Sequence, residues 1–438
     1  MGRLLMISHQ YPPLVSIATV RLLRFLRHLG SEGWMVDLIT ARPERYRVRD
    51  VLEVPQGIPG VRVFRESCLP EVDTAVQRKT TWLGDGVTER LRKWKSLRTT
   101  SRVVREWIPV ISEPLSWQWA ATRVGRRLME ADRYDCLYSS SGPLAPHRAA
   151  ASLARRSGVP WVAEFRDAVV ENPYHPKPTL LHLRYFLSQE ARIVGEASGV
   201  VVTTRTHADL LRLRYGDGKR ITVIPNGYDP VEYGPDEGGL PDRFTLIHGG
   251  NLYGSRSIQP LLLGWREWLR DRSDQSPRPM LLFYGRAFNL DLSRFLMDHE
   301  LTDTVKIMGV QRHQEVLAAM KRAHASVVIK SAGDRIHIPG KLYEGLGSGR
   351  PVLLLGPPSE ASELVEGLRA GVWVESTEPR AIARALDCLA SWPAGALAGR
   401  EDYRADNLAR RLARFLEETA KVRVSVANPP LARVGAGR

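Results

Sequence analysis

The chain has 438 residues, of which 43% are hydrophobic and 25% are charged, values typical of a soluble globular protein. Its length predicts two or three domains, and its longest apolar runs are too short for a transmembrane helix. The three cysteines are isolated, which argues against a disulfide scaffold and against a cysteine-based metal site.

The formal net charge is +15, and the densest basic patch lies at residues 90–105, where Arg and Lys alternate with Leu and Trp at helical spacing. This pattern is typical of a helix lying in a membrane interface, which would give residues 90–111 an anionic membrane surface as partner. It is equally typical of a surface helix whose aromatic face packs on its own domain, and both interpretations remain open. Nucleic acid is not expected as a partner, because no nucleic-acid-binding motif appears.

In the N-terminal half, hydrophobic periodicity predicts alternating strands and helices, an order that favours a parallel sheet. The predicted strands are residues 4–8, 35–40, 134–139, 161–165, 199–204 and 220–224, and the predicted helices are 18–32, 147–157 and 180–196. Residues 41–120, with scattered Pro and basic residues, are interpreted as an irregular insert. We therefore expect a first domain at residues 1–233 and a linker rich in Gly and Pro at 234–242.

The same alternation restarts after the linker and predicts a second domain at residues 243–401. Its predicted strands are residues 244–248, 280–284, 305–308, 325–330, 352–355 and 371–375, and its predicted helices are 258–269, 292–299, 315–323, one that begins at 340, and 379–390. A further helix is predicted at 402–422, and the tail at 423–438 is predicted to be disordered.

One motif in the second domain carries chemistry, namely Pro339-Gly340-Lys341-Leu342-Tyr343-Glu344. A turn leads into a helix whose first turns present a cation and a carboxylate on one face. A helix N-terminus binds anions, and a carboxylate one turn further accepts hydrogen bonds from a diol. The motif therefore predicts a nucleotide diphosphate site. The same residues would also fit an ordinary α/β domain in which Lys341 and Glu344 form a surface ion pair. Because the notable loops all follow strands, they open on one side of their sheets, which favours the functional interpretation.

The chain resembles the GT-B glycosyltransferases of family 4 type. The resemblance rests on several motifs in order: Ile7-Ser8-His9-Gln10-Tyr11-Pro12-Pro13, Tyr134 to Ser141, Glu164-Phe165-Arg166-Asp167, Val223-Ile224-Pro225-Asn226-Gly227, His248 to Tyr253, Gly309-Val310 and the motif above. It implies an α/β fold of two Rossmann-like doubly wound domains that face each other across a cleft. It further implies an acceptor-binding first domain, a second domain that binds the nucleotide-sugar, and a last helix that packs back on the first domain.

The resemblance also implies a retaining transfer of a hexosyl or N-acetylhexosaminyl group from a nucleotide-sugar donor to an acceptor hydroxyl, with no cofactor and no metal. Without a metal, the leaving diphosphate must be stabilised by cations and backbone N–H groups. The candidate catalytic residues are Arg256, Lys341, His147 and Asp167. The candidate nucleotide- and donor-binding residues are Gly250, Asn251, Gly309, Val310, Arg312, Gly340 and Glu344, and the candidate acceptor-binding residues are His9, Tyr11 and Arg166.

Three of these residues also have plain structural interpretations. His147 at a helix start and His9 after a strand fit positions without a catalytic role, and Asp167 fits a helix cap.

The sequence departs from the family pattern at two points. Ile336, with Asp334 nearby, stands where the family has a first glutamate for the donor sugar, and Ser16-Ile17 stand where the N-terminal loop usually has two glycines.

We expect a cytoplasmic glycosyltransferase of surface polysaccharide or glycolipid synthesis with a carbohydrate or lipid-linked acceptor, peripheral at the inner face of the cell membrane if residues 90–111 bind lipid. A nucleotide-sugar epimerase and a non-catalytic nucleotide-binding module of the same fold remain alternatives.

Overall fold

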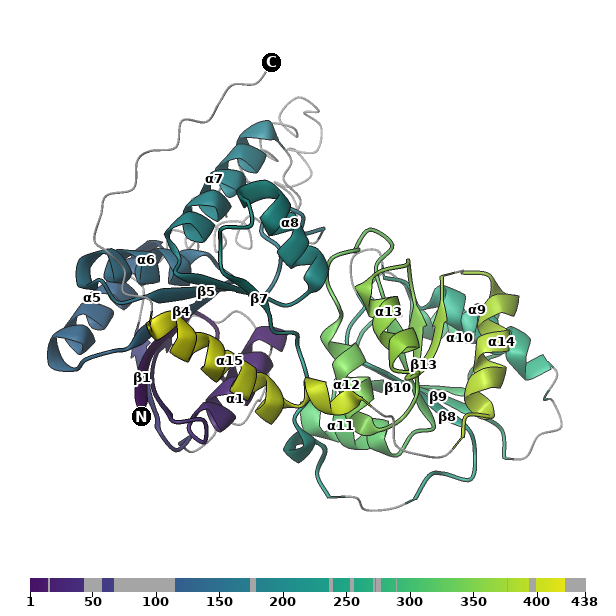
Figure 1. Cartoon of the computed structure of the whole chain (residues 1–438). Coiled ribbons are helices and arrows are strands. Elements are labelled where there is room, and N and C mark those ends of the chain that lie inside the picture. The colour runs from purple at the N-terminus through teal and green to yellow at the C-terminus, as the bar shows by residue number, and fades with distance from the viewer. Residues whose placement is uncertain are drawn as a thin grey trace, which may run out of the picture.

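The computed structural model consists of two α/β domains that lie side by side (Figure 1). It describes residues 1–14, 16–42, 57–66, 115–173, 179–235, 239–252, 256–270, 272, 277–288, 290–375, 377–393 and 399–421. The predictions for the basic segment at 90–111 and for the tail at 423–438 lie outside these residues. No helix in the described part of the chain is both long and apolar enough to cross a membrane.

The first domain is built on a seven-stranded parallel sheet with the order β3-β2-β1-β4-β5-β6-β7. Its strands are β1 (Gly2–Ser8), β2 (Trp34–Ala41), β3 (Val61–Glu66), β4 (Cys136–Ser140), β5 (Trp161–Phe165), β6 (Gly199–Val202) and β7 (Ile221–Val223). The prediction of an irregular insert at 41–120 is wrong for residues 61–66, which form the edge strand β3. This strand was missed because it is only partly buried and carries Arg62, Arg65 and Glu66.

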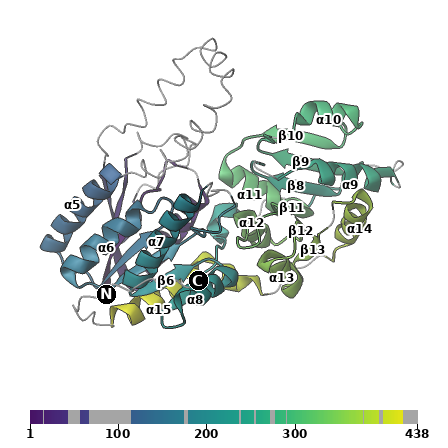
Figure 2. The ribbon, with the colours of Figure 1, turned by 90° about the horizontal axis from the view of Figure 1, so that it is seen from above.

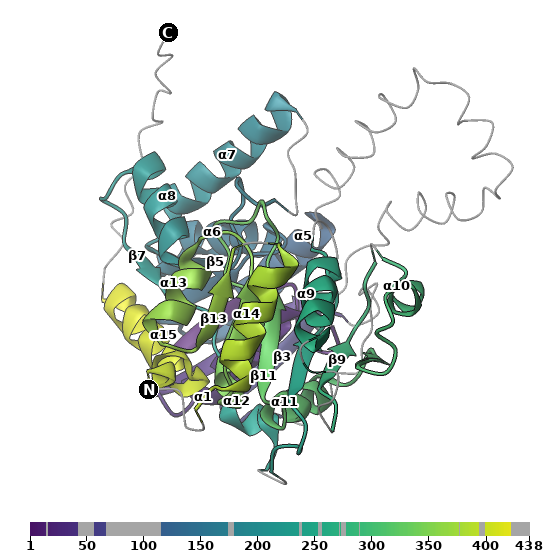
Figure 3. The ribbon, with the colours of Figure 1, turned by 90° about the vertical axis from the view of Figure 1, so that its right-hand side faces the viewer.

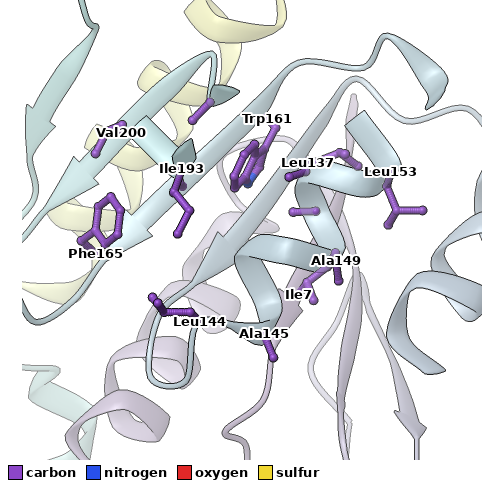
Figure 4. Close-up of a cluster of buried hydrophobic side chains, with 14 of the residues drawn as sticks. Ile7, Leu137, Leu144, Ala145, Ala149, Leu153, Trp161, Phe165, Ile193 and Val200 are labelled. Atoms are coloured by element: carbon purple, nitrogen blue, oxygen red, sulfur yellow. The ribbon is translucent and has the colours of Figure 1, made fainter. Parts of the chain in front are cut away.

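Both faces of this sheet are buried, since neighbouring residues of β1 enter different cores. Leu5 and Ile7 belong to the core that also contains residues of α5, α6 and α7, shown in Figure 4. Leu4 and Met6 belong to the opposite core, with α1 and α15. The helices of this domain are α1 (Ile17–Leu29), α5 (Leu115–Ala131), α6 (Ala145–Ser157), α7 (Leu180–Glu196) and α8 (Arg205–Tyr215).

The second domain has a six-stranded parallel sheet of order β10-β9-β8-β11-β12-β13. The strands are β8 (Thr245–Gly249), β9 (Met280–Tyr284), β10 (Val305–Gly309), β11 (Ala325–Ile329), β12 (Val352–Leu355) and β13 (Gly371–Val374). The helices are α9 (Gln259–Arg270), α10 (Leu292–Asp298), α11 (His313–Lys321), α12 (Gly340–Ser348), α13 (Glu360–Gly367) and α14 (Pro379–Ala390). Helices α9 and α14 pack together on one face of the sheet, the face turned to the viewer in Figure 3.

The chain crosses between the domains twice. After β7 it passes through the 3₁₀ turn η2 (Pro230–Tyr233) into the second domain, and it returns through the 3₁₀ turn η3 (Arg400–Tyr403) into α15 (Ala405–Ala420). Helix α15 lies against α1 of the first domain (Figure 1), with Leu408, Leu412 and Leu416 in the shared core. Figure 2 shows α15 running along the first domain. Burying each of these side chains stabilises the docked helix by about 1.5–3 kcal/mol.

The two crossings are hydrogen-bonded to each other. Tyr228 N–H donates to the Tyr403 carbonyl at 3.0 Å, and Ala405 N–H donates to the Tyr228 carbonyl at 2.8 Å. A Cβ atom on Gly227 would overlap the Tyr403 carbonyl oxygen and Leu408 Cδ1. A glycine is therefore required here because the returning chain approaches its Cα directly.

Two buried arginines of α1 fasten the first crossing. Arg21 donates to Glu164 at 2.8 Å and to the carbonyls of Ile224 and Pro225. Arg24 donates to both carboxylate oxygens of Glu232 and to the Gly227 carbonyl. Burial alone would raise the pKa of Glu164, but the Arg21 guanidinium reverses this effect and lowers it, so the pair stays ionised.

The close approach at Gly227 predicts that Gly227→Ala destabilises the protein by about 1–3 kcal/mol, because the added methyl group must push the returning chain aside. Thermal unfolding followed by circular dichroism measures this effect. Gly195→Ala in α7 is the matched control, since its Cβ would meet no atom within 4 Å and alanine favours helix. Equal unfolding temperatures for Gly227→Ala and the wild type would contradict this explanation.

Candidate functional site

The candidate site lies where the carboxyl ends of the parallel strands meet the gap between the domains. In the second domain it is made by the loops after β8, β9, β10 and β11, and in the first domain by the loops after β1, β4 and β5. In doubly wound sheets, ligands bind at this edge. The predicted site residues lie on these loops and on the helices that follow them.

Lys341 occupies the first turn of α12 and reaches the loop after β8. Its Nζ donates to the Asn251 carbonyl at 3.3 Å, and a Cβ on Gly250 would lie 2.7 Å from that Nζ. Gly250 has a φ of +107°, a conformation that favours glycine. A Cβ on Gly285, in the loop after β9, would touch the Gly250 backbone at 2.5 Å. The two glycines therefore let two loops and a cation converge on one spot.

The charge on Lys341 is poised near neutral pH. Burial and the positive charge of Arg256 lower its pKa to about 8, although Glu344 acts in the opposite direction. Arg256 therefore lies within electrostatic reach of Lys341, which stands in the first turn of α12. Two cations near a helix N-terminus favour an anion, and a bound anion would restore the Lys341 pKa.

Glu344, one turn further along α12, is paired with a residue that the sequence analysis missed. His313 Nε2 lies 2.9 Å from Glu344 Oε1, and both side chains are mostly buried. Burial alone would raise the pKa of Glu344, but His313, Arg24 and Lys341 lower it to about 2, and the same pairing raises the pKa of His313 above its ordinary value. His313 is the first residue of α11, directly after the β10 loop, and the rule that site residues follow strands would have indicated it.

The remaining donor candidates border this group. Gly309 ends β10 with a φ of +69°, and its carbonyl accepts from Gly285 N–H at 2.6 Å. Val310 is 49% exposed, and Arg312, the residue before α11, is exposed. Their position leaves an open rim beside the Glu344–His313 pair.

In the first domain, Arg166 ties three loops together. Its guanidinium donates to Asp167 at 3.1 Å and approaches Gln10 Oε1 at 3.4 Å, and a Cβ on Gly142 would meet its Nη2 at 2.7 Å. The Asp167 side chain is 48% exposed and acts electrostatically on His207 together with His337 of the second domain. Asp167 therefore lies on the first-domain wall, within electrostatic reach of the second domain.

The other first-domain candidates are more enclosed. His9 is half-buried with its ring 5.0 Å from that of Trp117, and burial lowers its pKa to about 4. Tyr11 is buried beneath the Arg65 guanidinium. His147 is fully buried, with Nδ1 2.7 Å from Ser139 Oγ, and burial lowers its pKa to about 3. The structure therefore places His147 in the core as a neutral imidazole, away from solvent, and its catalytic role stays a prediction.

The first-domain and second-domain sides of the candidate site contact each other at several points. Ser16 caps α1, and the Ile17 side chain, 51% exposed, lies 3.3 Å from where a Cβ on Gly340 would stand. Ala168 N–H donates to His337 Nε2 at 3.2 Å. The N-termini of α1 and α12 therefore meet across the gap, and Ile17 narrows the space where the family resemblance expects two glycines.

The loop before α12 does not offer a carboxylate in place of the missing glutamate. Ile336 is buried, and Asp334, only 1% exposed, accepts from His337 N–H at 3.0 Å and lies 2.9 Å from its Nδ1. Because Nε2 accepts from Ala168 N–H, Nδ1 is the protonated nitrogen of the His337 ring, and it donates a hydrogen bond to Asp334. No group of three or more His, Cys, Asp or Glu residues in the described ranges is arranged to hold a metal ion.

Comparison with known proteins agrees with this architecture. A family model described as "Glycosyl transferase 4-like domain" matches residues 18–227. Similar solved structures include a glycosyltransferase from Rickettsia africae, with a TM-score of 0.63 and 11% identity over 96% of this chain and 99% of that one. The sucrose-phosphate synthase of Thermosynechococcus elongatus has a TM-score of 0.60 and 15% identity over 96% of this chain and 96% of that one. The UDP-GlcNAc 2-epimerase of Methanocaldococcus jannaschii has a TM-score of 0.56 and 10% identity over 95% of this chain and 99% of that one. A search of curated proteins finds no significant match.

At these identities the solved structures establish the fold alone, and the family model matches a segment that lies within the first domain. The predicted α/β architecture of two facing Rossmann-like domains is confirmed, as is the resemblance on which it was based. The chain therefore has the GT-B fold, and its residues 18–227 match the glycosyl transferase 4-like family model.

Proposed function

We propose that the protein is a retaining glycosyltransferase that moves a sugar from a nucleotide-sugar donor to an acceptor hydroxyl. The observation that carries the proposal is the placement of Lys341 at the α12 N-terminus against Gly250 and Asn251, with Arg256 within electrostatic reach and the ionised Glu344 one turn away. The matching family of the first domain supports a glycosyl transfer rather than another use of a nucleotide.

The donor diphosphate would bind between Gly250 and Lys341. As the bond from the sugar to the diphosphate breaks, charge grows on the leaving phosphate, and the two cations and the helical N–H groups stabilise it most in the transition state. This electrostatic work would replace a metal. The Glu344 carboxylate would then accept hydrogen bonds from the ribose hydroxyls, using the oxygen that does not contact His313.

The acceptor would enter from the first domain. Asp167 has the exposure needed to orient a hydroxyl, and Arg166 fixes the Asp167 carboxylate at 3.1 Å. In a retaining reaction at the front face of the sugar, the leaving phosphate oxygen would take the acceptor proton, and no separate base is needed. The lipid-linked or polysaccharide acceptor, and the peripheral membrane location, rest on the basic Trp-containing segment at 90–111 and stay predictions from the sequence.

Two other activities use the same features. An epimerase would bind the same donor, and the M. jannaschii 2-epimerase has this fold. A non-catalytic nucleotide-binding module is suggested by Ile17, which narrows the gap at Gly340, and by Ile336 at the place of the missing glutamate.

The nucleotide assignment predicts that Glu344→Ala weakens binding of the preferred nucleoside diphosphate about tenfold to a hundredfold, because hydrogen bonds to a charged group are lost. UDP, GDP, ADP and dTDP are compared by thermal shift and calorimetry. Glu366→Ala, an exposed glutamate on α13, removes the same charge and should bind as the wild type does. Unchanged affinity in a folded Glu344→Ala protein would remove this assignment.

The depressed pKa of Lys341 predicts a pH dependence of nucleotide binding. Below about pH 8 the ammonium is charged and binds the diphosphate, and above this pH the free protein loses that proton, so Kd should rise by up to tenfold per pH unit. Calorimetry with the preferred nucleotide from pH 7 to 9.5 measures it. In Lys341→Arg the slope should vanish, since arginine stays protonated, and a flat wild-type profile would rule out Lys341 as the diphosphate ligand.

The reaction class is tested by incubating the enzyme with nucleotide-sugar in EDTA, with and without a panel of sugar, sugar-phosphate and lipid-linked acceptors. We expect the free nucleoside diphosphate and a new α-linked product from an α-linked donor only when acceptor is present. A donor changed at a sugar carbon without acceptor indicates the epimerase, and nucleotide binding without turnover on any acceptor indicates the binding module.

A further inference from the structure

A second charged cavity lies outside the candidate site, where both interdomain crossings meet the second domain. Its volume is about 490 Å³, within the range of roughly 300–1,000 Å³ usual for small-molecule sites. It is lined by residues of the first crossing, the end of α11, the end of α12 and the return segment, and its charged lining residues are Lys321, Arg350, Arg400, Glu401 and Arg404. Figure 1 shows the yellow return segment passing alongside α12.

At the end of α12, two glycines let the tyrosines of the first crossing and Arg400 of the return segment pack directly against the helix backbone. A Cβ on Gly347 would overlap the Tyr233 hydroxyl and lie 2.6 Å from the Tyr228 ring. Gly349 ends the helix with a φ of +75°, and a Cβ there would meet Arg400 Nη1 at 2.8 Å. The wall is therefore formed by backbone and by two buried tyrosines.

Cations outnumber carboxylates in the lining by four to one, Glu401 being the single acidic residue. Each of the three arginines uses part of its guanidinium group for a hydrogen bond that fixes the side chain. Arg400 donates to the Leu346 carbonyl at 3.2 Å, Arg350 to the Lys321 carbonyl at 3.0 Å, and Arg404 to Asp406 at 2.9 Å. A guanidinium has five N–H donors, so each arginine keeps donors beyond these contacts.

Three arginines and a lysine around a small cavity match the chemistry of a phosphate group, whose oxygens accept the paired hydrogen bonds of an arginine fork. The Glu401 carboxylate, the Asp406 carboxylate paired with Arg404, and the carbonyl end of α12 oppose an anion here, and four cations against two carboxylates leave a net positive charge. We propose that this cavity binds a small phosphorylated molecule, which would tie Lys321 and Arg350 of the second domain to Arg400 and Arg404 of the return segment.

This site is separate from the nucleotide site but shares α12 with it. The helix has 9 residues, so its two ends lie about 13 Å apart. Lys341 is at the N-terminal end and the cavity at the other. Tyr233 lines the cavity and donates to the Glu344 carbonyl at 2.6 Å, so it contacts the turn of α12 that carries Glu344. A ligand in the cavity would therefore act on the position of α12 and on the two crossings between the domains.

The test measures binding of inorganic phosphate, pyrophosphate and glucose 6-phosphate by calorimetry and thermal shift, at low salt, in the full chain carrying Lys341→Ala. That background weakens anion binding at the nucleotide site, so the remaining binding reports the cavity. We expect saturable binding of at least one probe, weakened about tenfold or more by adding Lys321→Glu. Arg322→Glu, one residue further and exposed, makes the same charge change outside the lining and should leave binding unchanged.

Arg404→Ala is tested in parallel, because its side chain is 42% exposed and its removal should leave the fold intact. It decides the result if Lys321→Glu fails to fold. No saturable binding of any probe, or equal binding in the folded cavity variants and in Arg322→Glu, would overturn the proposal. Failure of the nucleotide assignment would instead appear as insensitivity of nucleotide binding to Glu344→Ala, so the two failures are distinguishable.

Discussion

The geometry of the molecule depends on two buried guanidinium groups of α1. Arg21 and Arg24 reach the crossing segment, pair with Glu164 and Glu232, and satisfy backbone carbonyls that regular structure leaves without partners. Removing one partner of such a pair typically costs about 3–5 kcal/mol, because a charge remains buried without compensation. The two ion pairs therefore contribute less to stability than to fixing where the chain leaves the first domain, and the placement of the second domain depends on that point.

In the second domain, α12 links the crossing segment to the candidate site. One end of the helix carries Lys341, its middle carries Glu344, and its last turn packs on the two tyrosines of the crossing through Gly347. A rigid helix held at both ends cannot adjust one site without affecting the other. The small residues of its last turn thus have a positional role that the chemistry of Lys341 and Glu344 does not explain.

The domains are also held together beyond the candidate site. Glu360, at the start of α13, accepts from the N–H groups of Arg205 and Thr206 at 3.0 Å each, so a side chain of one domain caps a helix of the other. A carboxylate at a helix N-terminus is stabilised by the helix dipole. Ile17 also packs beside Gly340, and Ala168 N–H donates to His337. These three contacts hold the two domains close together. Entry of a nucleotide-sugar would require these contacts to loosen, and their polar and small-area nature is compatible with such a movement.

Periodicity and turn chemistry in the sequence were sufficient for the two sheets, the strand-end loops and the spacing of Lys341 and Glu344, because these features depend on residues close together in the chain. The sequence motifs also included Gly227. A glycine is required there because the Tyr403 carbonyl, from a segment far along the chain, lies against its Cα. The partners of two charges depended on tertiary structure, namely His313 for Glu344 and Glu232 for Arg24. Burial of His147 and inclusion of β3 in the sheet were decided in the same way, since solvent exposure and strand pairing are set by what the rest of the chain packs against a residue.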